Sequence, residues 1–187
     1  DLSNLPNACI SILEKLYGHT FPIHLDDFST LLYYQILIHS KELPVFLDVS
    51  LDLSNRIQNL LTPCFRFSSF AELLKTKQLT ATRITRSLLH ILLDLKQSDF
   101  EDFFTNQTMY ARLLGFKKSS SKILREIQTN SRIPVITKVA DANSLLSLQH
   151  NKMFMNDIRA SHIYNQVVFS KFHTEIKDEY TVGPVII

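Results

Sequence analysis

The chain has 187 residues with 20 Lys/Arg, 18 Asp/Glu and a formal net charge of +2, and 45% of its residues are hydrophobic. This apolar content can build a folded core, which excludes a disordered chain, and three Gly and six Pro exclude collagen-like and low-complexity classes. No apolar run approaches the roughly 18 residues of a membrane helix, and no basic leader precedes the short run at 8–13, so we expect a cytoplasmic protein without membrane contact.

The first hundred residues are predicted to form a helical bundle. Apolar residues recur there at steps of three and four, the spacing of one helix face. Breaks between the segments fall near Pro22, Pro44 and Pro63. The predicted helices are 27–40, 51–61, 68–76 and 80–96.

The pattern changes after Phe104. Residues 109–116 and 132–138 are short apolar or β-branched runs, and the segment 119–130 between them has helical spacing. Strand, helix and strand with a crossover of this length fit a parallel βαβ unit. A further helix is predicted around 141–163, and the tail VGPVII is strand-like. The expected fold class is therefore mainly α, with a helical subdomain at 1–105 and a small α/β subdomain at 106–187.

Positive charge is concentrated in the middle of the chain. Residues 1–70 hold four Lys/Arg and seven Asp/Glu, residues 71–138 hold twelve and six, and residues 139–187 hold four and five. A one-sided basic surface is typical of proteins that bind a phosphate backbone. The middle third is therefore the first place to look for a binding surface.

The segment LLKTKQLTATRITRSLLHILL, residues 73–93, contains no acidic residue. On a helical wheel its apolar residues share one face, while Arg83, Arg86 and His90 lie on the opposite face. Thr80 or Thr82 is expected to cap the helix. The basic residues of this segment are candidate phosphate ligands, and they are Lys75, Lys77, Arg83, Arg86 and His90. The alternative is that the arginines pair with acids of the bundle, such as Asp48 or Asp52.

A second basic cluster lies at the start of the predicted βαβ helix. Arg112 is in the first strand, and Lys117, Lys118 and Lys122 surround the expected helix start. Free backbone N–H groups at such a position, together with cations, can hold a phosphate. The alternative is an ordinary solvated loop, because no glycine-rich phosphate motif is present.

Catalytic and metal-binding patterns are absent from the sequence. The seven His residues fall in no HExxH, HxH or HxGH frame, and no GxSxG motif is present. Cys9 and Cys64 are far apart and lack metal-ligand neighbours, so we expect two buried free thiols in a reducing compartment. The sequence predicts no catalytic residue, no metal site and no cofactor in this chain.

Several stretches resemble a known family in order and spacing. LPNACISILEKL, LLKTKQLTATRITRSLLHILL, YARLLGFKKSSSKIL, RIPVITK and DIRASHIY are similar to the C-terminal half of the HIGH-type nucleotidyltransferases that include bacterial tRNA(Met) cytidine acetate ligases. The resemblance implies a parent enzyme that uses ATP to activate acetate and then acetylates the wobble cytidine of elongator methionine tRNA. The family's adenylating motifs have no counterpart here, and the chain starts at Asp1, so we expect a piece of a longer protein without the N-terminal catalytic domain.

The resemblance extends to single residues. The family pattern resembles KTKRYT followed by an Arg-rich helix, whereas this chain has Gln78 and Leu79 in place of the Arg and Tyr. A cation and an aromatic platform are therefore expected to be missing there. Tyr110 or Phe116 could stack on a splayed base, with core packing as the alternative.

The expected function is the docking of tRNA for chemistry done elsewhere. Two other functions stay open on the sequence. One is a protein-interaction or homo-oligomerisation module, with Leu89 and Leu93 on an exposed second face of the helix. The other is retention of an ATP or acetyl-adenylate contact at 115–122.

Overall fold

A computed structural model of the protein describes residues 5–64, 66–106 and 109–187. The chain forms two compact units, which are described separately here. Unit 1 comprises Asp1–Leu92 and His162–Ile176, and unit 2 comprises Leu93–Ser161 and Lys177–Ile187. The expected subdomain limits at 1–105 and 106–187 remain a prediction about independently folding pieces.

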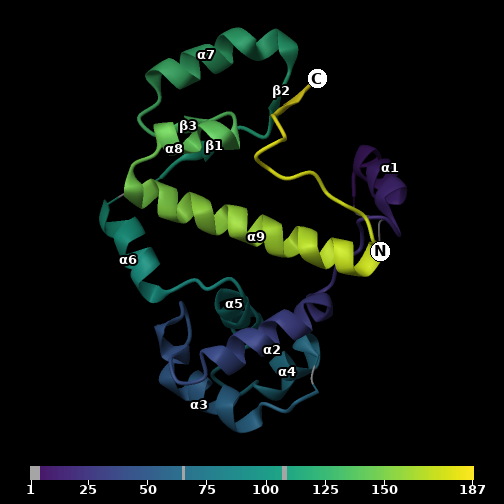
Figure 1. Ribbon diagram of the computed structural model, residues 1–187, viewed down its shortest axis with the longest axis vertical. Helices are drawn as coiled ribbons and strands as arrows, with labels where there is room; N and C mark the ends of the chain where they lie inside the picture. Colours follow the sequence, from purple (N-terminus) through teal and green to yellow (C-terminus); the bar gives the residue numbers. More distant parts are fainter. Residues whose placement is uncertain (1–4, 65, 107–108) are drawn as a thin grey trace. The chain divides into compact units, whose positions relative to one another are not determined.

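Unit 1 is helical (Figure 1). All four helices predicted in the first hundred residues are present, with ends that differ by one to four residues. The short helix at the N-terminal end was not predicted. The elements are α1 (Asn7–Leu16), η1 (Leu25–Phe28), α2 (Ser29–Ile38), η2 (Leu43–Val45), α3 (Leu51–Leu60), α4 (Phe67–Leu73) and α5 (Ala81–Leu92).

The core of unit 1 is built around α5, which packs against α2 and α4. Ile84, Leu88 and Ile91 on the predicted apolar face are each 0% exposed. Burying one such side chain contributes about 1.5–3 kcal/mol relative to leaving it in water. The α5 helix is therefore held rigidly by its apolar face, and its opposite face is displayed to solvent.

Helix α5 is shorter than predicted, because it ends at Leu92 and not at residue 96. Asp94 has a φ of 54°, a left-handed conformation that stops a helix and that Asp tolerates better than most residues. The next helix, α6 (Gln97–Asn106), starts immediately afterwards. Its first turn is capped by the Asp99 carboxylate, which accepts the Lys96 N–H at 3.1 Å. Leu95 therefore lies in a turn and not on the apolar stripe of α5.

Unit 2 contains the predicted parallel βαβ unit (Figure 1). Strands β1 (Ala111–Arg112) and β3 (Val135–Ile136) pair in parallel, with Ala111 opposite Val135, and α7 (Ser121–Asn130) lies in the crossover between them. The mainly α fold with a small parallel β unit is thus confirmed. The predicted helix around 141–163 was wrong at its start. Two short elements, η4 (Val139–Asp141) and α8 (Ala142–Leu145), come before α9 (Leu148–Phe172).

A second parallel pair joins β2 (Gly115–Phe116) to β4 (Val185–Ile186), as the strand-like tail indicated. Gly115 allows this pairing, because a Cβ atom there would lie 2.8 Å from the Val185 carbonyl oxygen. The 3₁₀ turn η3 (Lys118–Ser120) follows β2 and leads into α7. Ile136, Phe154 and Ile158 form the centre of this unit's apolar core.

Both cysteines are free thiols, but the expectation that they are buried was wrong. Cys9 and Cys64 are exposed. Cys9 lies on α1, a helix without a buried residue, and Cys64 follows Pro63 in the turn between α3 and α4. Apolar composition placed them inside, whereas the local elements carry them on the surface.

None of the helices within the described residues is both long and apolar enough to cross a lipid bilayer.

Candidate nucleic-acid interface

The loop before α5 is fixed by two threonines. The Thr76 hydroxyl accepts the N–H groups of Gln78 and Leu79 at 3.2 and 3.0 Å. The Thr80 hydroxyl accepts the Arg83 N–H at 3.3 Å, which confirms it as a capping residue of α5. These hydrogen bonds hold the loop against the helix, and the exposed basic side chains therefore start from an ordered backbone.

Leu79 is 6% exposed and belongs to the core of unit 1. The sequence comparison had suggested that an aromatic stacking platform is missing at this position. In this chain, position 79 is an interior position. The departure from the family pattern at 79 therefore concerns core packing, and only Gln78 changes the exposed surface.

The arginines on the basic face of α5 have different surroundings. Arg83 is exposed and forms no ion pair with any residue that the structure describes. Arg86 places its Nε 2.9 Å from the Asp48 carboxylate, so the pairing considered as an alternative is present for this residue. Asp48 removes much of the positive charge of Arg86, whereas Arg83 keeps its own.

His90 is held by the bundle. Its Nδ1 lies 2.9 Å from the Leu47 carbonyl oxygen and 3.5 Å from the Asp48 carboxylate, and its side chain is 13% exposed. The neutral ring must place its proton on Nδ1 to donate to the carbonyl. This nitrogen is therefore not available to a phosphate.

The two lysines before α5 are both exposed. Lys75 forms an ion pair with Glu72 at 2.8 Å, an exposed i, i+3 pair of the kind that contributes little stability. Lys77 forms no ion pair with a described residue. Of the five basic residues predicted in this segment, Lys77 and Arg83 thus remain without an acidic partner among the described residues.

Arg112 is held inside unit 2. Its guanidinium pairs with the Glu179 carboxylate, which also accepts the Ser161 hydroxyl. Both charged side chains are largely covered, with 29% and 20% of their surface exposed. The contact joins β1 to the C-terminal segment. Arg112 is therefore a structural ion-pair partner, and its predicted RNA contact would require breaking this pair.

Tyr110 packs in the core of unit 2 with its ring edge-on to Phe154, at 5.6 Å between ring centroids. Its hydroxyl donates to Asp157. Burial and then this hydrogen bond raise the pKa of the Tyr110 hydroxyl above its ordinary value. The core-packing alternative therefore describes Tyr110, which cannot stack on a base from this position.

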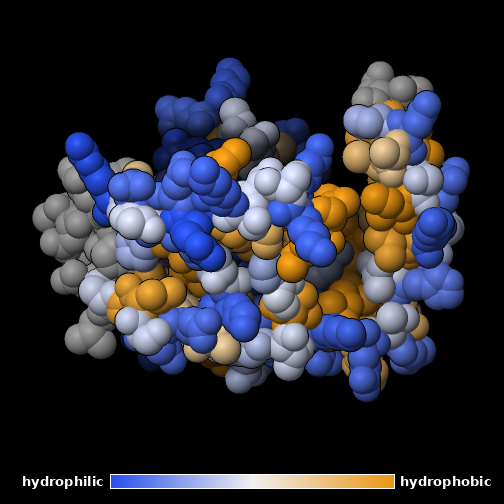
Figure 2. Space-filling model, turned by 90° about the horizontal axis from the view of Figure 1, so that it is seen from above, coloured by the Kyte–Doolittle hydropathy of each residue, from blue (hydrophilic) through white to orange (hydrophobic). Residues whose placement is uncertain are grey.

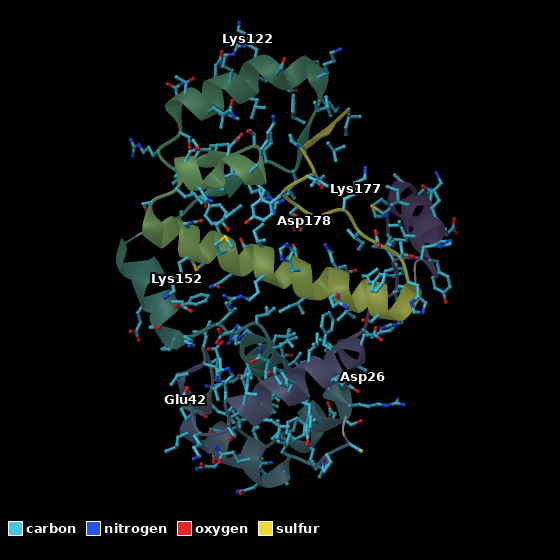
Figure 3. The ribbon with its side chains drawn as sticks, viewed as in Figure 1. Asp26, Glu42, Lys122, Lys152, Lys177 and Asp178 are labelled. Atoms are coloured by element: carbon cyan, nitrogen blue, oxygen red, sulfur yellow. The ribbon has the colours of Figure 1, made fainter. Side chains whose placement is uncertain are left out.

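Lys117, Lys118 and Lys122 are exposed and form no ion pair with a described residue. Figure 3 shows Lys122 on the outer side of α7. The expected set of free N–H groups is not present as predicted, however. The Lys118 N–H donates to the Ile187 carbonyl and the Ser120 N–H to the Lys117 carbonyl, both at 2.8 Å. The backbone of η3 uses these donors itself, so the lysine side chains are the groups that can meet an anion.

Three further cations of unit 2 were missed by the sequence prediction. Arg125, Arg132 and Lys138 are exposed, and the described residues supply no ion-pair partner to any of them. Residues 113–140 hold six Lys/Arg and a single acid, Glu126. That count was the signal that could have found them. We call the six residues the crossover cations, and they are Lys117, Lys118, Lys122, Arg125, Arg132 and Lys138.

Helix α7 also has an apolar side. Ile123 and Ile127 are 59% and 50% exposed, and no residue of α7 is buried. At 100° per residue they lie on the side of α7 opposite to Lys122 and Arg125. Figure 2 looks onto the side where α7 lies in Figure 1, and it shows hydrophilic groups beside separate hydrophobic areas. The cations and the isoleucines of α7 therefore face different surroundings.

No group of three or more His, Cys, Asp or Glu that could hold a metal ion occurs among the described residues. The chemistry that the exposed groups offer is therefore anion binding by lysine and arginine.

Comparison with known proteins gives relatives of one kind. A tRNA(Met) cytidine acetate ligase of Thermoanaerobacter sp. (strain X514) is 35% identical over 154 residues, which are 82% of this chain and 36% of that protein. The ligase of the same name from Listeria monocytogenes serovar 1/2a is 30% identical over 182 residues, 97% of this chain and 42% of that protein. The chain thus spans less than half the length of these relatives.

A solved structure supports the same fold. The crystal structure of Thermotoga maritima TmcAL superimposes with a TM-score of 0.87 at 20% identity, over 98% of this chain and 46% of that one. A second form of that protein, bound with alpha-thio ATP, gives the same TM-score. The sequence profile described as HIGH Nucleotidyl Transferase matches residues 2–179. The resemblance inferred from the quoted motifs is confirmed, and the chain belongs to the HIGH nucleotidyltransferase family.

Proposed function

We propose that this chain is the tRNA-docking part of a cytoplasmic tRNA(Met) cytidine acetate ligase, and that it binds elongator methionine tRNA. In this proposal ATP and acetate are used by residues outside this chain, and the chain itself contributes no catalytic group. The observation that carries the proposal is the set of six crossover cations, exposed and without an acidic partner among the described residues. The names of the relatives supply the identity of the RNA.

Unpaired surface cations favour a polyanion for a physical reason. A folded RNA is surrounded by condensed counterions, and each lysine or arginine that neutralises a phosphate releases some of them. Such contacts fix the position of the RNA and carry little sequence information. The crossover cations and the pair Lys77 and Arg83 are suited to this task, because neither set is neutralised by a described acid.

The test is binding of methionine tRNA to the 187-residue chain across a salt series. We expect log K to fall with log salt by about 0.7–0.9 for each phosphate contacted. The variant Lys117→Glu/Lys122→Glu should bind more weakly and lower that slope by about 1.5–2. The matched control is Lys15→Glu/Lys41→Glu, which reverses two exposed cations in the acidic N-terminal third and should leave the slope unchanged. Absence of tRNA binding by the folded wild type contradicts the proposal.

A second candidate is a protein-interaction module, and the half-exposed Ile123 and Ile127 favour it. The original argument for this function used Leu89, which instead packs against the core of unit 1. A mass that rises with protein concentration, falls back in Ile123→Ser/Ile127→Ser and does not respond to tRNA would put this function first.

A further inference from the structure

Asp48 occupies an unusual position beside the basic face of α5. Its φ is 61°, in the left-handed region, and it lies in the connection between η2 and α3. Non-glycine residues adopt this conformation only where the surrounding contacts impose it. The contacts that do so all come from α5.

Three α5 residues hold this short segment. The Ser87 hydroxyl donates to the Asp48 carbonyl at 2.9 Å, and His90 Nδ1 meets the Leu47 carbonyl at 2.9 Å. Ser87 is 0% exposed and His90 is largely covered, so both anchors are shielded from water. The backbone around Asp48 is thereby fixed to the helix, and its carboxylate has a defined position.

That carboxylate contacts Arg86 through one nitrogen. The Asp48 oxygen lies 2.9 Å from Arg86 Nε, and the Arg86 side chain is 60% exposed. A guanidinium held at Nε still presents the N–H groups of both Nη atoms, and these match a phosphate in a two-point geometry. An unheld arginine samples many rotamers and loses that freedom when it binds.

We infer that Asp48 is a positioning residue for RNA, because it orients the Arg86 guanidinium so that the Nη atoms face a phosphate group. This inference rests on the proposed function. It differs from simple neutralisation, in which Asp48 would only weaken polyanion binding by adding negative charge.

Two substitutions separate orientation from charge. Asp48→Asn removes the negative charge and keeps an oxygen acceptor for Nε, whereas Asp48→Gly removes the charge and the acceptor together. Asn and Gly both tolerate a positive φ, so the backbone can be kept in both variants. Since the two variants carry the same net charge, long-range Coulomb effects cancel in their comparison.

The experiment measures the Kd of methionine tRNA for the wild type, Asp48→Asn and Asp48→Gly, each also in an Arg86→Ala background. We expect Asp48→Asn to bind more tightly than the wild type, and Asp48→Gly to bind about three- to tenfold more weakly than Asp48→Asn. The difference between Asn and Gly should disappear in the Arg86→Ala background. Thermal unfolding of each variant checks that the folded state is retained.

The outcomes distinguish the two levels of the argument. Equal Kd values for Asp48→Asn and Asp48→Gly overturn the positioning role and leave the proposed function standing. A difference that persists without Arg86 also overturns it, because Asp48 then acts through the fold of its segment. A folded wild type that does not bind tRNA overturns the proposed function and this role together.

Discussion

The basic face of α5 and the crossover of unit 2 are both rich in cations, but the protein treats them differently. On α5, Arg86 and His90 are engaged with Asp48 and the Leu47 carbonyl, and the helix is anchored by a fully buried stripe. Around α7, the six crossover cations have no described acidic partner and the helix has no buried residue. Sequence charge alone therefore overstated the first region and understated the second. What decides is how many acids the fold brings beside each cation.

The largest expected difference between the two helices concerns stability. Leu88→Ala on α5 removes a side chain that is 0% exposed, and we expect the free energy of unfolding to fall by about 2–5 kcal/mol. Ile127→Ala on α7 removes a side chain that is 50% exposed and should cost about 1 kcal/mol or less. Urea unfolding of both variants measures this. Equal losses would mean that α7 is buried in the protein in solution.

The next effect concerns RNA binding by the two surfaces. Lys122→Gln/Arg125→Gln should reduce tRNA affinity about tenfold at low salt, because two unpaired cations are lost. Arg83→Gln/Arg86→Gln should reduce it less, because Asp48 already compensates part of the Arg86 charge. Fluorescence anisotropy with labelled methionine tRNA compares the pairs. A larger loss for the α5 pair would reverse the ranking of the two surfaces.

A smaller effect distinguishes how the two helices begin. Thr80→Ala removes the hydroxyl that accepts the Arg83 N–H, and the free energy of unfolding should fall by about 1 kcal/mol. Ser120→Ala at the start of α7 should change it by less than about 0.5 kcal/mol, because the Ser120 side chain makes no capping hydrogen bond. Thermal unfolding of the two variants tests the contrast. Restoration of stability by Thr80→Ser would tie the loss to the hydroxyl.

The smallest expected effect is a pH dependence in unit 1. Hydrogen bonds from the Ser68 backbone N–H and hydroxyl lower the pKa of Asp26 below its ordinary value. A lowered folded-state pKa gives stability that is present above the unfolded pKa of about 3.9 and is lost as the pH falls further. Asp26→Asn should therefore flatten the loss of stability below about pH 4. Identical acid unfolding curves for the variant and the wild type would exclude this contribution.

Much of the fold could be predicted from the sequence, since apolar spacing located α2 to α5 and the βαβ unit. The end of α5 could not, because it depends on a left-handed Asp94 that no periodicity encodes. The binding surface was predicted in part. Lys77, Arg83 and the three crossover lysines are exposed as expected, whereas the Asp48 and Glu179 pairings need the tertiary structure. Arg125, Arg132 and Lys138 were visible in the charge count and were overlooked because they match no motif.

The burial of Leu79 has a consequence for how this family can change over evolution. Where relatives carry a tyrosine at this position, a ring must be placed in a closely packed interior, and inserting extra volume into such a core is itself destabilising. The residues that surround position 79 must then change with it. An alignment of the family should therefore show position 79 varying together with core positions on α2 and α5, and varying independently of the exposed charge at position 78.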